Sequence, residues 1–219
     1  MTGPDPGRDC PRCPRLVAFR QQARTAHPAW HNAPVPAFGD PQAWLAIIGL
    51  APGLHGANRT GRPFTGDHAG LLLYATLLRL GLATGRYHPD GRDDLRLHGC
   101  LIVNPVRCVP PANRPLPDEI AQCRPFFEGA LAALPRLTTL IALGAIAHAA
   151  TLRAHGLPAS RHRFAHGATH ALPHGRTLID SFHCSRLNTN TGRLTAPMFE
   201  AIFHAALSHR ASPRRQENA

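Results

Sequence analysis

Lysine is absent from this chain. Its 24 basic side chains are all arginines, set against 13 acidic ones, and the formal net charge is +11 with the 15 histidines neutral. The absence of lysine excludes any reaction that proceeds through a lysine Schiff base. Arginine makes paired hydrogen bonds to phosphate, so the surplus of positive charge favours a nucleic-acid partner over a merely basic surface.

Long apolar runs and a secretory leader are also missing. No stretch of the 219 residues reaches the roughly 18 apolar residues that a membrane-spanning helix needs. The opening segment, MTGPDPGRDCPRCPRLVAFR, lacks the apolar core of a signal peptide. We therefore expect no membrane partner and a cytoplasmic location. The composition is that of one globular domain, expected over 1–209, followed by a flexible C-terminal tail over 210–219.

Apolar segments alternate with helical patterns along the chain. Buried strands are predicted at 44–50, 100–106, 138–144 and 176–183. Helices are predicted at 68–82, 117–134, 145–156 and 195–210, the last with Thr195 as its N-cap. This order indicates an α/β fold with a parallel sheet between helical layers.

The turns that follow the first, second and fourth predicted strands are the expected site. Ligands of parallel sheets bind beyond the carboxyl ends of the strands, and these turns have the least ordinary composition in the chain. The histidine-rich stretch 161–175 is instead predicted to form a hairpin or a long loop outside the site.

The cysteines suggest a metal centre. Cys10 and Cys13 form a Cys-x-x-Cys pair, and Cys108 and Cys123 could complete a four-sulfur site. On spacing alone zinc and an iron–sulfur cluster are nearly equal candidates, and free thiols are the alternative. Cys100 is predicted to be a core residue. A centre of this kind would be structural and would gather four arginines as candidate phosphate contacts, namely Arg12, Arg15, Arg107 and Arg124.

A glycine-rich segment, GLAPGLHGANRTGRPFTGD, occupies residues 49–67 after the first strand. Its spacing from Gly56 to Gly61 matches a phosphate-binding P-loop. However, Arg62 and Pro63 stand where that motif requires Lys and Ser or Thr, which disfavours nucleotide hydrolysis. Glycines after a buried strand indicate instead that the main chain comes close to a ligand.

Taken together, five segments resemble the uracil-DNA glycosylase superfamily. They are GLAPG, NRTGRPFTGD, the four cysteines, NPVRCVPPANR and HCSRLNTNTGRL, which span Cys10 to Leu194. Within the superfamily the chain is most similar to the iron–sulfur enzymes of family 5, also called type B, with family 4 as a near relative. The resemblance implies a three-layer α/β/α sandwich around a four-stranded parallel sheet. It also implies a [4Fe–4S] cluster, with zinc as the less favoured occupant, on Cys10, Cys13, Cys108 and Cys123.

The resemblance further implies a DNA repair glycosylase, which we expect to be monofunctional and monomeric. Its partner would be DNA containing uracil, with hypoxanthine and other deaminated bases as further candidates. The enzyme would flip the base out of the stack and hydrolyse the N-glycosidic bond to leave an abasic site. The absence of lysine independently favours water as the nucleophile. The alternative is a non-enzymatic metal-cluster protein that binds nucleic acid and uses the glycine segment only as part of its fold.

Two residues are implied to carry the chemistry. His183 would donate a hydrogen bond to O2 of the base as negative charge accumulates there. Sister families place an Asn, Asp or Glu in the GLAPG motif to position the attacking water, and this chain has none there. Either stabilisation of the leaving base suffices, or Asp67 orients the water. The alternative role of Asp67 is the N-cap of the following helix, a position that aspartate favours.

The base would be bound by main chain and by three side chains. Phe64 would stack on the flipped base, with core packing as the alternative. Asn104 would read the uracil edge or cap a strand end, and Asn113 would face the base or serve a turn. Cys184 is expected to be a buried thiol and not a ligand. The main-chain cradle is expected from Gly49, Ala51 and Gly53.

The segment SRLNTNTGRL is implied to enter the DNA. Leu194 would be the apolar wedge that fills the space left by the base, and Arg186 and Arg193 would contact phosphates. Asn188 is a further candidate DNA contact. An ordinary surface turn is the alternative.

Overall fold

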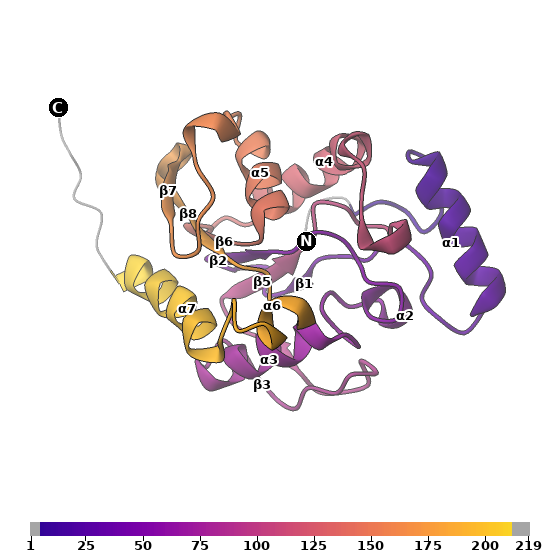
Figure 1. Ribbon diagram of the computed structural model, residues 1–219, viewed down its shortest axis with the longest axis horizontal. Helices are drawn as coiled ribbons and strands as arrows, with labels where there is room; N and C mark the ends of the chain where they lie inside the picture. The colour runs from indigo at the N-terminus through magenta and orange to yellow at the C-terminus, as the bar shows by residue number, and fades with distance from the viewer. Residues whose placement is uncertain (1–4, 212–219) are drawn as a thin grey trace.

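The computed structural model describes residues 5–211, which fold around one six-stranded sheet (Figure 1). The strand order is β1–β5–β2–β6–β8–β7. The strands are β1 Phe38–Gly39, β2 Leu45–Ile48, β5 Cys100–Val103, β6 Thr139–Leu143, β7 Thr169–Leu172 and β8 Arg176–Ser181. A separate two-stranded hairpin pairs β3 (Ala83–Thr84) with β4 (Arg96–Leu97).

The four central strands confirm the predicted parallel core. β5, β2, β6 and β8 are parallel neighbours, and almost every residue in them is buried because helices cover both faces. The prediction of only four strands is wrong. β1 adds an antiparallel edge beside β5, and β7 adds another beside β8. The histidine-rich stretch was predicted to form either a hairpin or a long loop. It contains β7, so the hairpin prediction is the correct one.

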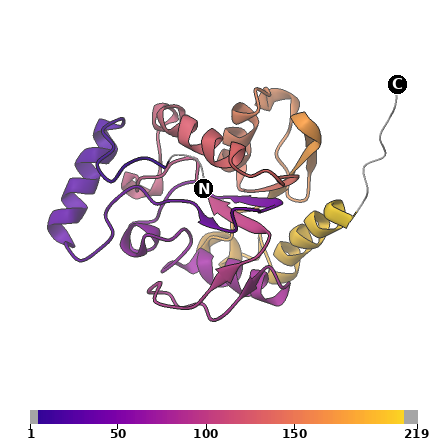
Figure 2. The same cartoon turned by 180° about the vertical axis from the view of Figure 1, so that it is seen from behind.

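Helices form a layer on each side of the sheet, as Figures 1 and 2 show. α4 (Pro117–Ala132) and α5 (Ala145–Ala154) pack on one face, and α3 (His68–Arg79) and α7 (Ala196–Ala211) on the other. Neighbouring β2 residues point to opposite layers: Ile47 packs with α3 and α7, whereas Ile48 packs with α4 and α5. The α/β/α sandwich is therefore confirmed.

Capping residues set several helix boundaries. Asp67 precedes α3, and its Oδ1 accepts a hydrogen bond from the Gly70 amide at 3.0 Å. Thr195 precedes α7 and accepts from the Met198 amide at 3.4 Å, as predicted. α7 continues to Ala211, so the predicted tail begins inside this helix. Residues 1–4 and 212–219 lie outside the described residues.

Three helices were not expected from the sequence, and they are α1 (Pro14–Ala26), α2 (Ala57–Thr60) and α6 (Arg186–Asn190). α1 begins directly after Cys13 with a proline in its first turn, and it lies at one end of the molecule, away from the sheet (Figure 1). Single 3₁₀ turns occur at Pro111–Asn113, Ala159–Arg161 and Pro173–Gly175. None of the helices within 5–211 combines the length and apolarity of a membrane span.

Candidate active site

Loops at the carboxyl ends of β2, β5 and β8 line one solvent-open cavity of about 330 Å³. Its position agrees with the expectation from sheet topology. The predicted catalytic and base-binding residues meet there although they come from three separate loops. Those that line the cavity are Ala51, Gly53, Phe64, Asp67, Asn104, Asn113 and His183.

Gly49 lies directly behind the cavity wall. A Cβ atom at this position would overlap the Asn104 Oδ1 and would lie 2.8 Å from the Phe64 ring. Gly56, which was not among the predicted cradle residues, is also constrained, because its Cβ would lie 2.8 Å from the Asp67 Oδ2. The glycines therefore let main chain and functional side chains approach each other closely, as the cradle hypothesis requires.

Asp67 caps α3 and also faces the cavity. Its Oδ1 receives the Gly70 amide hydrogen bond, which confirms the N-cap. Its Oδ2 turns toward the glycine loop, 3.6 Å from where a Cβ of Gly53 would stand. Burial raises the pKa of Asp67, opposed by the amides of Gly70 and Ala69. A carboxylate with a raised pKa is a better proton acceptor, so the geometry allows Asp67 to orient water as well.

His183 and Phe64 lie side by side in the cavity wall. Their ring centroids are 5.9 Å apart and the rings are inclined by 27°. Burial lowers the pKa of His183 to about 4, so the imidazole is neutral near pH 7 and carries one N–H donor. Phe64 is 6% exposed and has a φ of 54°, a left-handed conformation that is unusual for a bulky residue. Strain of this kind is typical of functional sites.

Asn104 presents an unsatisfied polar atom. The residue is 4% exposed, and among the described residues its Oδ1 has no hydrogen-bond partner. An orphaned buried acceptor costs about 1–3 kcal/mol unless a ligand satisfies it. Asn113 differs because it is exposed, with a φ of 55°, at the rim of the cavity. The turn that holds Asn113 is confirmed, and its contact with a base stays a prediction.

The four predicted metal ligands line a second cavity beside α1, so the structure brings Cys10, Cys13, Cys108 and Cys123 together. Arg20 Nη1 donates to the Cys108 Sγ at 3.4 Å, and the Arg107 amide donates to the Cys123 Sγ at 3.4 Å. Burial raises the pKa of Cys108 to about 11 and that of Cys123 to about 12. Cys100 and Cys184 are fully buried elsewhere, as predicted.

The segment after His183 differs from the prediction. Leu194 is 1% exposed and packs in the core with α3 and α7, so its predicted role as a wedge is wrong. The exposed apolar side chain is Leu187 on α6, at 72% exposure. The sequence reasoning missed Leu187, although its position four residues after His183 and outside the apolar pattern of α7 was the available signal.

The remaining polar residues of this segment are either exposed or hydrogen-bonded to its main chain. Asn188 Nδ2 donates to the His183 carbonyl at 2.8 Å, so this amide holds the histidine's main chain. Arg186 is exposed, and the Arg193 guanidinium carbon lies 4.6 Å from the Phe182 ring centroid. Contacts of these three residues with DNA stay predictions.

Two other arginines are committed to ion pairs inside the protein. Arg107 is fully buried and lies 3.1 Å from Asp5, so its predicted phosphate contact is wrong. Arg62 makes a bidentate pair with Asp93, with both N–O distances at 2.6 Å. The P-loop interpretation was therefore correctly rejected, since Arg62 does not face an empty phosphate site.

Comparison with known proteins gives a consistent result. Residues 36–207 match the family model described as the uracil DNA glycosylase superfamily. The chain is 49% identical over 203 residues to the type-5 uracil-DNA glycosylase of Thermus thermophilus, covering 90% of this chain and 92% of that protein. It is 40% identical to the type-5 enzyme of Mycobacterium bovis, covering 90% and 76% of the two chains. It is 37% identical to that of Pyrobaculum aerophilum, covering 90% and 88%.

Proposed function

This chain belongs to the uracil-DNA glycosylase superfamily, and from that premise we propose that its cavity receives a uracil flipped out of DNA. The residues that line the cavity then hydrolyse the bond between uracil and deoxyribose. One observation carries the proposal: His183, Asp67, Phe64 and Asn104, from three loops, line the same cavity. A cluster protein that used the glycine segment only for folding would not need an orphaned acceptor beside a neutral histidine. The non-enzymatic alternative is therefore not supported.

His183 stabilises the departing base. Cleavage of the glycosidic bond leaves negative charge on the pyrimidine, part of it on O2. A neutral imidazole held in place by its surroundings donates a hydrogen bond to that oxygen without needing reorganisation. Loss of one such donor typically costs about 3–4 kcal/mol of transition-state stabilisation.

Asp67 orients the water that attacks the sugar. As the base leaves, the sugar acquires the positive charge of an oxocarbenium ion, which a nearby carboxylate stabilises. Burial and the raised pKa of Asp67 support its action as a proton acceptor. The glycine loop keeps the Oδ2 accessible, because a side chain at Gly56 would collide with it.

Asn104 and Phe64 select and hold the base. Uracil carries an N3–H donor and hypoxanthine an N1–H donor, whereas the parent bases cytosine and adenine have a bare ring nitrogen at these positions. The unsatisfied Asn104 Oδ1 accepts such a donor, which supports deaminated bases as the substrate class. Stacking on Phe64 contributes about 1–3 kcal/mol, similar to the cost of extruding the base.

The exposed Leu187 fills the space in the duplex that the extruded base leaves behind. It stands on α6, whose N-cap Ser185 also lines the cavity. Arg186 is the first residue of this helix and Arg193 follows it, and both contact phosphates.

We further propose that the four cysteines hold a [4Fe–4S] cluster, with zinc as the less favoured occupant. Their donor set fits, because buried thiols with raised pKa values ionise only beside a positive centre. A tetrahedral zinc with Zn–S near 2.3 Å would hold its sulfurs about 3.8 Å apart. Among the described residues no three cysteine sulfurs lie within 4.8 Å of one another, which favours the larger cluster. The cluster would fasten the N-terminal segment.

A uracil-containing duplex tests the activity directly. Incubation with cluster-loaded protein followed by alkali should cleave the strand at the uracil position and release free uracil, whereas a cytosine duplex should stay intact. Borohydride should trap no lysine adduct, because the chain has no lysine. Failure to release uracil from every single- and double-stranded substrate would refute the proposal.

A further inference from the structure

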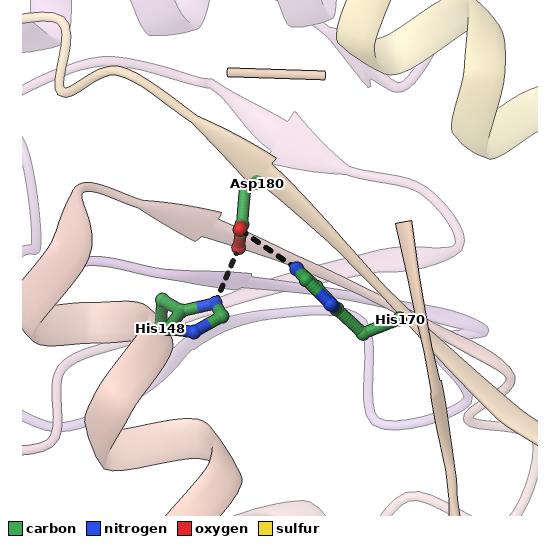
Figure 3. Close-up of side chains that lie close together, drawn as sticks. All are labelled: His148, His170 and Asp180. Carbon is green, nitrogen blue, oxygen red and sulfur yellow. Dashed lines mark hydrogen bonds and ion pairs between the residues drawn. The ribbon is translucent and has the colours of Figure 1, made fainter. Parts of the chain in front are cut away.

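A buried cluster of His148, Asp180 and His170 lies outside the cavity that the proposed function uses (Figure 3). His148 comes from α5, Asp180 from β8 and His170 from β7. The His148 Nδ1 lies 2.7 Å from the Asp180 Oδ1, and the His170 Nε2 lies 2.9 Å from the Asp180 Oδ2. Their side chains are 3%, 0% and 10% exposed in the order His148, Asp180, His170. Among the described residues no other group brings three such atoms together within 4.8 Å.

The hydrogen bonds of His148 require one more proton than a neutral imidazole beside an ionised carboxylate carries, or a metal ion in its place. Its Nε2 lies 2.8 Å from the carbonyl oxygen of His162, and its Nδ1 faces the Asp180 carboxylate. Both partners are acceptors, but a neutral imidazole has only one N–H. Either an additional proton or a metal ion must therefore stand between His148 and Asp180.

The orientation of His148 is the one that metal-ligating histidines adopt. Such a histidine binds the metal through one nitrogen and donates its other N–H to a main-chain carbonyl or a carboxylate. Here the Nε2–H would donate to the His162 carbonyl, leaving the Nδ1 lone pair for the metal. We propose that His148, His170 and Asp180 form a binding site for one divalent zinc-class ion, separate from the cysteines.

The surroundings supply the rest of such a site. Two imidazole nitrogens and one carboxylate oxygen suit zinc, which takes a fourth ligand in tetrahedral geometry. The half-buried His162 ring, with its centroid 5.7 Å from that of His170, or a water molecule can supply it. Two ligand atoms of one zinc ion lie roughly 3.3 Å apart. Each of the two N–O distances would therefore lengthen by about half an ångström when the ion replaces the protons of the two hydrogen bonds.

Such an ion would fasten the histidine-rich loop to β8. The same loop carries His166, whose Nδ1 accepts a hydrogen bond from the Phe182 amide at 3.1 Å. Phe182 immediately precedes His183. The expected effect of the metal is therefore added stability of the hairpin and loop that pack beside the end of β8.

Cobalt titration of the protein with its cysteine site filled tests the proposal. One equivalent of Co²⁺ should bind and give visible d–d absorbance without a sulfur-to-cobalt charge-transfer band, because the ligands contain no thiolate. His170→Gln should abolish this binding while its amide still donates to Asp180. His174→Asn is the matched control, because His174 is an exposed histidine with φ 60° in the turn between β7 and β8. This control should bind cobalt like the unmodified chain.

Thermal unfolding gives a second readout that does not depend on absorbance. Added Zn²⁺ should raise Tm by a few degrees, chelator should reverse the shift, and His170→Gln should lose it. Bound cobalt that persists in His170→Gln, or a Tm insensitive to both zinc and chelator, would overturn the proposal. The cluster would then be a hydrogen-bond network that holds no metal ion.

Discussion

At the scale of single residues, Asp67 uses one carboxylate oxygen to cap α3 and turns the other toward the cavity. Asp67→Asn separates these uses, because asparagine caps helices as well as aspartate but carries no charge. We expect excision to slow about a hundredfold or more, as for loss of a catalytic base. Because the folded pKa of Asp67 is raised, its ionisation costs stability above that pKa, so Tm near pH 7 should be equal or higher. Single-turnover kinetics measures the excision rate, and melting curves measure Tm. An unchanged rate would mean that Asp67 only caps the helix.

His183 is expected to act on the rate and not on DNA binding. His183→Ala removes the donor to the leaving base, so single-turnover excision should fall a hundredfold or more, which is equivalent to about 3–4 kcal/mol. Affinity for uracil-containing duplex, measured by fluorescence anisotropy, should change only modestly. A variant that loses binding in proportion to rate would contradict this role.

The same residue makes stability depend on pH. In the unfolded chain a histidine takes up a proton near pH 6.5, whereas the folded protein resists protonation of His183 down to about pH 4. Stability is therefore present above the unfolded pKa and is lost as pH falls from about 6.5 to 4, by at most about 3 kcal/mol. Measured by urea unfolding, the free energy of unfolding should fall less between pH 7 and pH 4.5 in His183→Gln than in the unmodified chain. Equal losses would show that His183 is not the buried titrating group.

Sequence motifs identified the residues that line the cavity. They did not identify the residues whose role depends on packing. His183 and Asp67 could be found because their neighbours in sequence define them. The burial of Leu194 depends on its packing with α3 and α7, and the exposed Leu187 is marked only by its position close to His183 and outside the apolar pattern of α7. The pairing of His148 with Asp180 was equally hidden, because it joins a helix to a strand 32 residues away.

At the scale of elements, prediction succeeded where burial is uniform. The central strands are continuous apolar runs, and these are recognisable in sequence. β1 has two residues and β7 alternates between exposed and partly buried positions, so neither edge strand carries such a signal. α2 and α6 are single turns that exist because loops around the cavity fold onto the sheet edge.

The short helix α6 gives a paired test of the corrected wedge. Leu187→Ala removes an exposed side chain, so stability should hardly change, while excision from duplex DNA should slow more than excision from single strands. Leu194→Ala empties part of the core and should cost about 2–5 kcal/mol of unfolding free energy. Each variant is the other's control. Equal effects of Leu187→Ala on both kinds of strand would rule out the wedge.

At the scale of the whole molecule, α1 packs outside the two main cores. Leu16 packs in a small apolar group with Val106 and Cys108, apart from the two main cores. Arg15 pairs with Glu119 on α4 at 2.7 Å, at the partly exposed edge of the same contact. The cysteine spacing predicted this long-range link, whereas the presence of a helix after Cys13 became visible only in the structure.

If the four cysteines hold a metal centre, this centre is the main attachment of α1. Removing the metal with oxidant and chelator should therefore speed amide hydrogen exchange across 10–26 and leave β2 and β6 protected, because their hydrogen bonds lie in the sheet core. Cys13→Ser should reproduce the effect and lose the visible absorbance of the cluster. Cys100→Ala, which alters a buried thiol in β5 outside this cavity, should do neither. Exchange in α1 that is indifferent to metal removal would mean that its apolar packing, ion pair and hydrogen bonds hold the helix in place without the metal.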